Sequence, residues 1–172
     1  GVFALDVSAP DDFGNSKVLW EFTDKHDADM GNVVGKPQIL KINTAAGSTT
    51  PNFQYFAVVA SGVNNHLADG AASSTGEPAL FFLQLSKGKT ANWVLGTNYF
   101  KIKFPVKSTA ITTGIVGFSV RTGFVDQLTY LYAGDLQGNL WKLDFTATGA
   151  SSWTLDALSS FKNSGTALPM FV

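Results

Sequence analysis

The densest group of acidic side chains follows the first two strand-like segments of the chain. Asp27 and Asp29 flank one alanine, His26 precedes them, and Asp24 lies a little earlier. Three carboxylates at alternating or nearby positions could bind calcium or another hard cation, because such ions prefer oxygen ligands. The set is incomplete compared with a calcium loop, and acidic residues are common in turns. We therefore interpret this segment as a solvated loop and keep a cation site at Asp24, Asp27 and Asp29 as the alternative.

Other catalytic chemistries lack the residues that they need. The sequence has two histidines, His26 and His66, and no cysteine, whereas a zinc site takes three or four ligands. It contains no Gly-x-x-x-x-Gly-Lys phosphate loop, no Gly-x-Ser-x-Gly and no His-Glu-x-x-His. Asp135 follows Gly134 in a predicted turn, where a carboxylate accepts hydrogen bonds from turn amides. We predict no catalytic residue, no bound cofactor and a protein that is not an enzyme.

A long polar segment is the best candidate for contact with a partner. Residues 62–78 are rich in Ala, Ser, Asn and Gly and separate two strand-like segments. Insertions on a repeat scaffold often carry binding residues. We predict partner contacts at Asn64, Asn65, His66 and Asp69, and a surface insertion without such a role is the alternative.

Composition excludes several classes of partner. The 172 residues include 12 Lys and Arg against 13 Asp and Glu, a net charge of −1, which provides no electrostatic footprint for nucleic acid or an anionic membrane. No apolar run approaches the ~18 residues of a membrane-spanning helix. The chain begins at Gly1, directly on a strand-like pattern, so we expect it to be cut from a larger extracellular protein.

The hydrophobic pattern predicts an all-β fold. Short β-branched and aromatic runs are bounded by turn residues, and no window of ten residues carries the apolar stripe of a helix. The predicted strands are residues 2–7, 17–22, 37–42, 54–61, 79–85, 92–95, 115–120, 128–133, 139–145 and 152–156.

An internal repeat defines the architecture further. Residues 1–7, 79–85 and 139–145 align without gaps, and the alternation of side chains places the aligned apolar positions on one face of a strand. A polar turn and a second predicted strand with a tryptophan follow each copy. The aligned positions are Phe3, Phe81 and Trp141, then Leu5, Leu83 and Leu143, then Val7, Leu85 and Phe145, and the tryptophans are Trp20, Trp93 and Trp153.

Recurring groups of four antiparallel strands are typical of a β-propeller. We predict a fragment of about two and a half quinoprotein-like blades, and the remainder of a parent chain would be needed to close the ring. A β-sandwich also has many short strands, but it does not require self-similarity. The tryptophans then pack between blades, with sugar stacking as the alternative. The predicted boundaries are residues 1–24 for the end of a blade, 36–104 and 110–158 for two blades, and 168–172 for the start of the next.

The third copy resembles a hallmark of the C-terminal propeller of PilC/PilY-type type IV pilus proteins. This hallmark runs from Tyr132 to Asp144. A single such strand is shared with quinoprotein propellers, whereas several stretches in register are specific to the pilus family. The other stretches that resemble this family, in the same order, are residues 1–7, 18–24, 29–31, 36–39 and 57–65.

The resemblance implies a non-enzymatic protein outside the cell, at the pilus tip or on the outer membrane of a Gram-negative bacterium. Proteins of this family promote pilus biogenesis, oppose retraction, and contribute to host-cell adhesion, twitching motility and virulence. The implied partners are pilus subunits (minor pilins) and a host-cell surface receptor.

The sequence departs from the family at one site. Family members often carry a calcium loop just before the hallmark, with oxygen ligands at alternating positions. From Val120 to Leu128 only Asp126 is acidic, and Arg121 would repel a divalent cation. We predict that this site is lost, so calcium as a ligand rests on the resemblance alone.

Two other functions stay open, because one fold can host several functions. A quinoprotein dehydrogenase would need a stacking floor, a metal cage and a catalytic aspartate on the propeller axis, and the sequence does not supply this set. A propeller scaffold for outer-membrane protein assembly would form a compact, complete ring.

Overall fold

The predicted all-β fold is confirmed by the computed structural model, which describes residues 1–12, 14–67, 70–106, 108 and 110–172. Antiparallel strands dominate, and the helices are single short turns. The strands are β1 (Val2–Leu5), β2 (Val18–Phe22), β3 (Gln38–Asn43), β4 (Phe53–Ala60), β5 (Gly62–Val63), β6 (Ala79–Gln84), β7 (Tyr99–Lys103), β8 (Gly114–Thr122), β9 (Leu128–Asp135), β10 (Leu140–Asp144), β11 (Lys162–Asn163) and β12 (Thr166–Ala167). The helices are η1 (Asn15–Lys17), η2 (Ala150–Ser152) and α1 (Leu155–Leu158).

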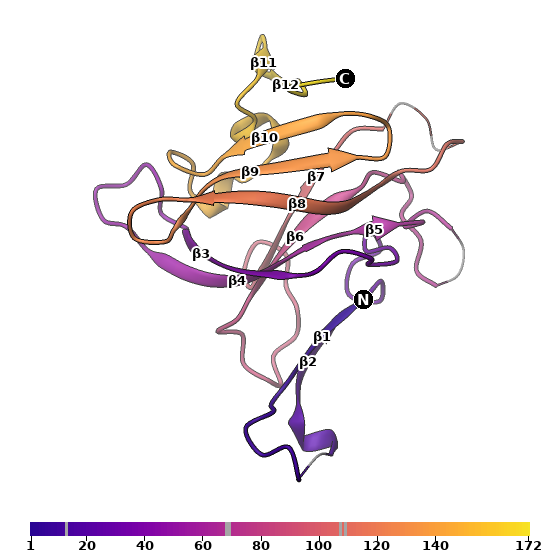
Figure 1. The fold of residues 1–172 in the computed structure, drawn as a ribbon, viewed down its shortest axis with the longest axis vertical. Coiled ribbons are helices and arrows are strands. Elements are labelled where there is room, and N and C mark those ends of the chain that lie inside the picture. The colour runs from indigo at the N-terminus through magenta and orange to yellow at the C-terminus, as the bar shows by residue number, and fades with distance from the viewer. Residues whose placement is uncertain (13, 68–69, 107, 109) are drawn as a thin grey trace.

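Three layers follow one another along the long axis of the molecule in chain order (Figure 1). The β1–β2 hairpin comes first. The first sheet has four strands in the order β3-β4-β6-β7, and the second sheet has four in the order β10-β9-β8-β5. The small β11–β12 hairpin lies beyond the second sheet, near the C-terminus. The two larger sheets are therefore arranged as successive blades.

A glycine at the end of β4 links the two sheets. Strand β4 ends at Ala60, and β5 begins only two residues later but pairs with β8 of the second sheet. Gly62 has a φ of +76°, and a Cβ at this position would meet the Asn32 carbonyl oxygen at 1.9 Å. Because only glycine tolerates both conditions, this residue allows one continuous segment to serve two blades.

The repeated strand buries opposite faces against opposite neighbours. In β6, Phe81 and Leu83 belong to a core cluster with Phe22 and partly buried Trp20 from the hairpin. The alternate residues of β6 face the second sheet, where Phe82 joins the same cluster as Trp141. In β6 the residues at the aligned positions of the repeat thus pack toward the preceding layer, and the residues between them pack toward the following layer.

The first copy of the repeat shows the consequence of this arrangement. Phe3 is 67% exposed, whereas its aligned partners Phe81 and Trp141 are 0% and 2% exposed. Among the described residues no layer packs against this face of β1, so Phe3 stays exposed.

The predicted packing role of the tryptophans is confirmed. Trp153 lies 5.1 Å from the ring of Phe82 and 5.3 Å from that of Phe145, so it contacts side chains from both sheets. Trp20 and Trp93 meet edge to face at 5.5 Å between the hairpin and the first sheet. Large aromatic rings thus fill both junctions between layers.

Two of the predicted tryptophan-bearing strands are wrong. Residues 92–94 form no regular structure and Leu95 makes only an isolated bridge to Tyr99. The Asn98 side chain holds this segment, because it accepts a hydrogen bond from the Val94 amide at 2.8 Å and donates one to the Asn92 carbonyl at 2.8 Å. The outer strand of the first sheet is β7 instead. Residues 152–156 enter the helix α1, because the Thr154 hydroxyl accepts a hydrogen bond from the Ala157 amide at 3.1 Å and caps the helix.

The outer edge of the second sheet is covered by isolated bridges. Leu143 bridges to Ser159, and Leu140 bridges to Phe171. Residues 168–172, which the sequence predicts as the start of a further blade, therefore lie against β10 in this structure. The other blade boundaries stay a prediction.

Candidate functional site

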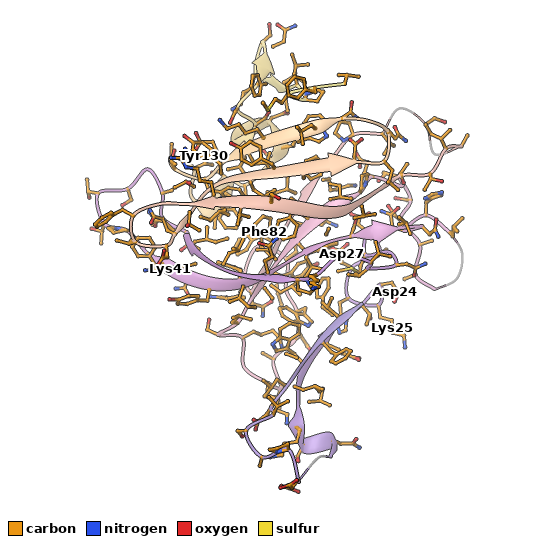
Figure 2. The ribbon with its side chains drawn as sticks, in the orientation of Figure 1. Asp24, Lys25, Asp27, Lys41, Phe82 and Tyr130 are labelled. Carbon is orange, nitrogen blue, oxygen red and sulfur yellow. The ribbon has the colours of Figure 1, made fainter. Side chains whose placement is uncertain are left out.

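The predicted acidic loop lies between the hairpin and the first sheet. Asp24, Lys25 and Asp27 lie on the same side of the molecule, near the start of the chain (Figure 2). The Asp27 carboxylate accepts a hydrogen bond from the Asp29 amide at 3.0 Å, and the Asp27 carbonyl accepts one from the Met30 amide at 3.0 Å. These local bonds fix a turn that directs Asp27 and Asp29 toward β7.

Two lysines of β7 bind these carboxylates. The Lys101 ammonium lies 2.9 Å from Asp27 and 2.7 Å from Asp29. Lys103 lies 3.7 Å from Asp29 and also pairs with Glu77. We call these five residues the ion network. It ties the loop before the first sheet to the outer strand of that sheet.

Hydrogen bonds complete the coordination of the ion network. The Tyr99 hydroxyl donates to Asp27 at 2.9 Å, and the Ser73 hydroxyl donates to Asp29 at 2.6 Å. The side chains of Asp27 and Asp29 are only 6% and 10% exposed. Buried charges of this kind are tolerated because each has a partner of opposite charge and further hydrogen bonds.

The environment shifts the protonation equilibria of these groups. Burial on its own raises the pKa of Asp29, but hydrogen bonds from Lys101 and Ser73 outweigh it and hold the pKa below its usual value. Burial lowers the pKa of Lys101, but bonds to Asp29 and Asp27 outweigh that effect and raise the pKa. Burial and the Asp27 charge raise the pKa of Tyr99. The shifts of Asp29 and Lys101 favour the ion pairs at neutral pH, and the shift of Tyr99 keeps its hydroxyl protonated as a donor to Asp27.

The ion network places an ammonium group where the alternative interpretation would place a metal ion. Lys101 bridges Asp27 and Asp29, while Asp24 points elsewhere and accepts a hydrogen bond from the Ala71 amide at 2.8 Å. Among the described residues, no group of three His, Cys, Asp or Glu side chains could hold a metal ion. This arrangement favours a structural role for the acidic loop.

Described residues of the polar segment 62–78 bind to this loop. Asn65 is 4% exposed, and its amide donates hydrogen bonds to the Asp29 carbonyl at 3.3 Å and the Glu77 carbonyl at 2.9 Å. The prediction of a partner contact at Asn65 is therefore corrected, because this side chain holds the segment in place. Such long-range bonds leave no signal in the local sequence.

The other predicted contact residues have different positions. Asn64 adopts a φ of +63°, and together with Asp24 and Asn65 it lines a small polar cavity of about 120 Å³. The His66 side chain is partly exposed, and its Nδ1 atom is buried without a hydrogen-bond partner among the described residues. Asp69 lies outside the described residues. Partner contacts at Asn64, His66 and Asp69 stay a prediction.

The segment from Val120 to Leu128 forms the β8–β9 hairpin. The turn closes through hydrogen bonds from Gly123 to the Gln127 carbonyl at 2.8 Å and from Asp126 to the Gly123 carbonyl at 3.1 Å. Lys41 from the first sheet donates to the Val125 carbonyl at 3.1 Å. A turn with one carboxylate and a neighbouring ammonium group is a poor site for calcium, which supports the prediction that the site is lost.

The predicted structural role of Asp135 is confirmed and extends further than the sequence indicates. Its Oδ1 atom accepts hydrogen bonds from the amides of Gln137 and Asn139, both at 3.0 Å. Its Oδ2 atom accepts from the Asn139 side chain at 2.8 Å and the Trp141 indole at 2.9 Å. One carboxylate therefore fixes both the β9–β10 turn and the orientation of a buried tryptophan.

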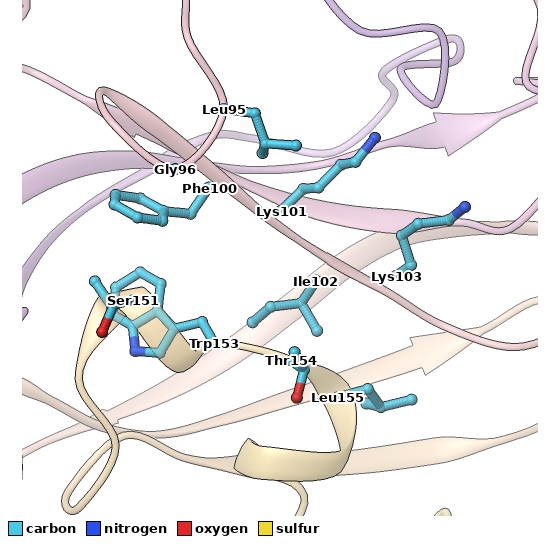
Figure 3. A pocket seen from close by; sticks show the side chains of 11 residues that line it. Leu95, Gly96, Phe100, Lys101, Ile102, Lys103, Ser151, Trp153, Thr154 and Leu155 are labelled. Atoms are coloured by element: carbon cyan, nitrogen blue, oxygen red, sulfur yellow. The ribbon is translucent and has the colours of Figure 1, made fainter.

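The sequence did not predict two grooves at the junctions between layers. We call the first the basic groove; it lies along β2 and residues 87–93 and has a volume of about 630 Å³. We call the second the apolar groove; it lies along β7 and residues 150–155 and has a volume of about 580 Å³ (Figure 3). The recurrence of Trp93 and Trp153 was the available signal, since each lines one groove.

Comparison with known proteins gives concordant matches. No family model matches the chain. The chain is 28% identical to a type IV pilus biogenesis factor PilY1 homolog of Xylella fastidiosa (strain Temecula1 / ATCC 700964), in an alignment of 176 residues that covers 99% of the chain. It is 30% identical over 149 residues, or 84% of its length, to the type IV pilus biogenesis factor PilY1 of Pseudomonas aeruginosa (strain UCBPP-PA14). The chain spans about a tenth of the length of these curated relatives, 10% in each case.

One solved structure has the same fold. The crystal structure of the Pseudomonas aeruginosa PilY1 C-terminal domain superimposes with a TM-score of 0.64 and 24% sequence identity. The superposition covers 96% of this chain and 31% of that domain. The likeness confirms the predicted propeller-type fold.

Proposed function

We propose that this chain is a non-enzymatic part of the type IV pilus machinery. It is homologous over nearly its whole length to one segment of the PilY1-type pilus biogenesis factors, as its sequence resemblance predicted. In this role the chain contributes rigid blades to a surface-exposed scaffold. The scaffold lies at the pilus tip or on the outer membrane. Among the described residues no helix is long and apolar enough to cross a membrane.

The finer part of the proposal concerns what the scaffold does. It promotes pilus biogenesis by opposing retraction, and through the extended pilus it contributes to twitching motility and host-cell adhesion. Minor pilins are its partners at the base of the tip, and a host-cell receptor is its partner on the outer side.

One observation carries the proposal: the segment that resembles the pilus family is also the segment that packs between the two larger sheets. The matched region includes the run from Tyr132 to Asp144, and within it the Asp135 carboxylate binds the Trp141 indole at 2.9 Å. Trp141 in turn contacts Phe104 at 5.6 Å, next to the first sheet. The hallmark thus supports the junction between blades, which is the task of a scaffold. The quinoprotein alternative has no such supporting observation.

The test is genetic. In the bacterium that carries this protein, the gene is replaced by a version without residues 1–172, and surface pili are counted by electron microscopy and by immunoblot of sheared pilin. We expect pili to be lost in the parent strain and to return in a strain that cannot retract them. The restored wild-type gene is the control.

Each outcome decides one part of the proposal. Unchanged numbers of pili in both strains would overturn the role in biogenesis. Loss of pili in both strains would overturn the antagonism of retraction and would favour a role in assembly alone.

A further inference from the structure

The basic groove and the apolar groove occupy equivalent places in successive junctions. Each lies between the outer strand of one layer and the connection that follows the repeated strand (β6 or β10) of the next layer. In the basic groove these parts are β2 and residues 87–93, and in the apolar groove they are β7 and residues 150–155. Because the architecture is shared, the difference between the two linings reports on what each groove can bind.

The two linings differ in charge and polarity. The apolar groove presents Phe100, Ile102 and Leu155 beside Trp153 (Figure 3). Its lining also includes Lys101 and Lys103, but both of these ammonium groups are paired with carboxylates of the ion network. The basic groove is lined by Lys25, Lys87, Lys89 and His26, against the single carboxylate of Glu21. Three of the 12 basic residues of a chain with a net charge of −1 therefore gather in one recess.

None of these lysines forms a close ion pair within the described part of the chain, although Asp24 and Asp6 act electrostatically on Lys25 and Lys89 from a longer distance. Among the described residues the ion pairs within 4.0 Å involve only Lys17, Lys101 and Lys103. The Lys87 ammonium instead donates to the carbonyls of Gly88 at 3.1 Å and Ala91 at 2.8 Å, and it lies 4.6 Å from the centre of the Trp93 ring.

Lys87 is therefore a partly desolvated cation without a counter-charge. Burial lowers the pKa of its ammonium group, and no acidic neighbour offsets that effect. Lys89 is held in position by the Ser16 carbonyl at 2.5 Å. A bound anion would supply the missing counter-charge at Lys87 and could form charge-assisted hydrogen bonds with both ammonium groups.

Aromatic rings form part of the same wall. Trp20 and Trp93 are partly exposed and line the groove. The Trp93 indole donates to the Glu21 carbonyl at 2.7 Å, which fixes the ring across the junction between the hairpin and the first sheet. The binding surface is thus already formed without a ligand, as is usual for small-molecule sites.

We propose that the basic groove binds an acidic polysaccharide. Its carboxylate or sulfate groups pair with Lys25, Lys87 and Lys89, and its sugar rings lie against Trp20 and Trp93. A recessed groove admits a single chain, whereas a flat anionic bilayer would reach only the rim, and the two tryptophans offer apolar faces to sugar rings. The inference does not depend on a role in pilus biogenesis.

The test uses heparin as the probe and the purified protein. Binding is measured by isothermal titration calorimetry at low and at physiological salt, with neutral dextran for comparison. The double variant Lys25→Gln/Lys89→Gln is compared with Lys36→Gln/Lys162→Gln, which removes the same charge at exposed positions outside the groove. We expect the groove variant to bind about fivefold to tenfold more weakly, as for the loss of two exposed ion pairs, and the control to bind like wild type.

The remaining outcomes overturn the proposal. The proposal is wrong if the wild-type protein does not bind heparin. It is also wrong if both double variants lose affinity for heparin equally, or if the groove variant keeps the affinity of the wild type. Binding of vesicles with anionic phospholipids, or of single-stranded DNA, as tightly as heparin at equal charge would assign the groove to a different class of partner. Circular dichroism confirms that each variant is folded.

Discussion

At the scale of residues, side chains that a sequence motif marks as important act mainly to hold the fold together. Asp135 lies in the stretch that resembles the pilus family, and its carboxylate binds two turn amides, one side-chain amide and the Trp141 indole. A carboxylate in this position would attract attention as a catalytic candidate. The structure instead gives it four donors and no open position for a substrate.

Replacing this carboxylate should destabilise the protein. We expect Asp135→Ala to lower the free energy of unfolding by about 2–3 kcal/mol, because several donors around a buried tryptophan lose their acceptor. Asp126→Asn is the matched control, since asparagine tolerates the φ of +59° at this position and should change stability by less than about 0.5 kcal/mol. Urea unfolding followed by tryptophan fluorescence measures both, and equal values for the two variants would contradict this account.

Calcium should not stabilise the protein through the β8–β9 turn. The turn carries one carboxylate, Asp126, and the Lys41 ammonium donates to the neighbouring Val125 carbonyl. We expect the melting temperature to be the same with millimolar calcium and with a chelator, as measured by differential scanning fluorimetry. A rise with calcium that Asp126→Ala abolishes would show that a site survives.

The ion network gives a prediction with a defined pH dependence. The depressed pKa of Asp29 means that its stabilising contribution is present above its usual value near 3.8 and is lost as the pH falls through the folded-state pKa. The raised pKa of Lys101 means that its contribution is present below 10.5 and is lost as the pH rises through its folded-state pKa. Between about pH 4 and pH 10 the ion network therefore contributes a constant amount.

Removing the central ammonium should break this balance. We expect Lys101→Met to lower the free energy of unfolding by about 3 kcal/mol at pH 7, because Asp27 and Asp29 are left as buried charges. The deficit should shrink as the pH is lowered toward 4, since Asp29 stays buried without the Lys101 ammonium and then takes up a proton more readily. Lys103→Met, at a more exposed position, should cost less. Chemical denaturation at several pH values checks this, and a deficit that is independent of pH would contradict it.

At the scale of elements, the alternation of faces along the repeated strand explains where side chains are buried. In β6 and β10 the aligned positions of the repeat face the preceding layer, and in β1 no layer of the described residues packs against the same positions. Phe81 is 0% exposed and Phe3 is 67% exposed, although the sequence gives them the same place in the repeat. Burial is thus decided by the neighbouring element and not by the strand alone.

This asymmetry can be measured with two substitutions. We expect Phe81→Ala to cost about 3–5 kcal/mol, as for other buried phenylalanines, and Phe3→Ala in the 172-residue chain to cost less than about 1 kcal/mol. Thermal or urea unfolding gives both values. Similar costs would contradict the assignment of the β1 face as unpartnered.

The sequence predicted the repeated strands β6 and β10 well and the strands that follow them poorly. Strands β6 and β10 are marked by a gapless repeat, which follows directly from the two-residue period of a strand. The outer strand β7 was missed because the alignment was anchored on Trp93, whereas Asn98 holds that residue in a segment without regular structure. The same anchor failed at Trp153, where the Thr154 cap starts a helix. The capping threonine and the alternation of Phe100 and Ile102 with lysines were the signals available.

The candidate site could be predicted only in part for a different reason. The sequence picked out Asp27 and Asp29, but their partner Lys101 lies more than 70 residues later, and only the folding of the first sheet brings them together. The same applies to Asn65, whose bond to the Asp29 carbonyl joins residues 36 positions apart. Local patterns identify charged and polar residues, whereas their partners depend on the tertiary structure.

At the scale of the whole molecule, three layers stack in chain order, and each junction is filled by aromatic side chains. Figure 2 shows Phe82 between the two larger sheets and Tyr130 on the second sheet. Lys142 lies 4.4 Å from the centre of the Tyr130 ring, so the face of the second sheet that carries Lys142 is more polar than the junction behind it. The apolar hairpin face at Phe3 and this aromatic, cationic face are the two ends of the stack.

An experimental structure of the purified protein is the most direct test of the central claim that the two sheets are successive blades. We predict that Phe81 and Leu83 face the β1–β2 hairpin, and that Trp141 and Leu143 face the first sheet. A sandwich in which the two sheets enclose a single core, with Phe81 turned to solvent, would contradict the account.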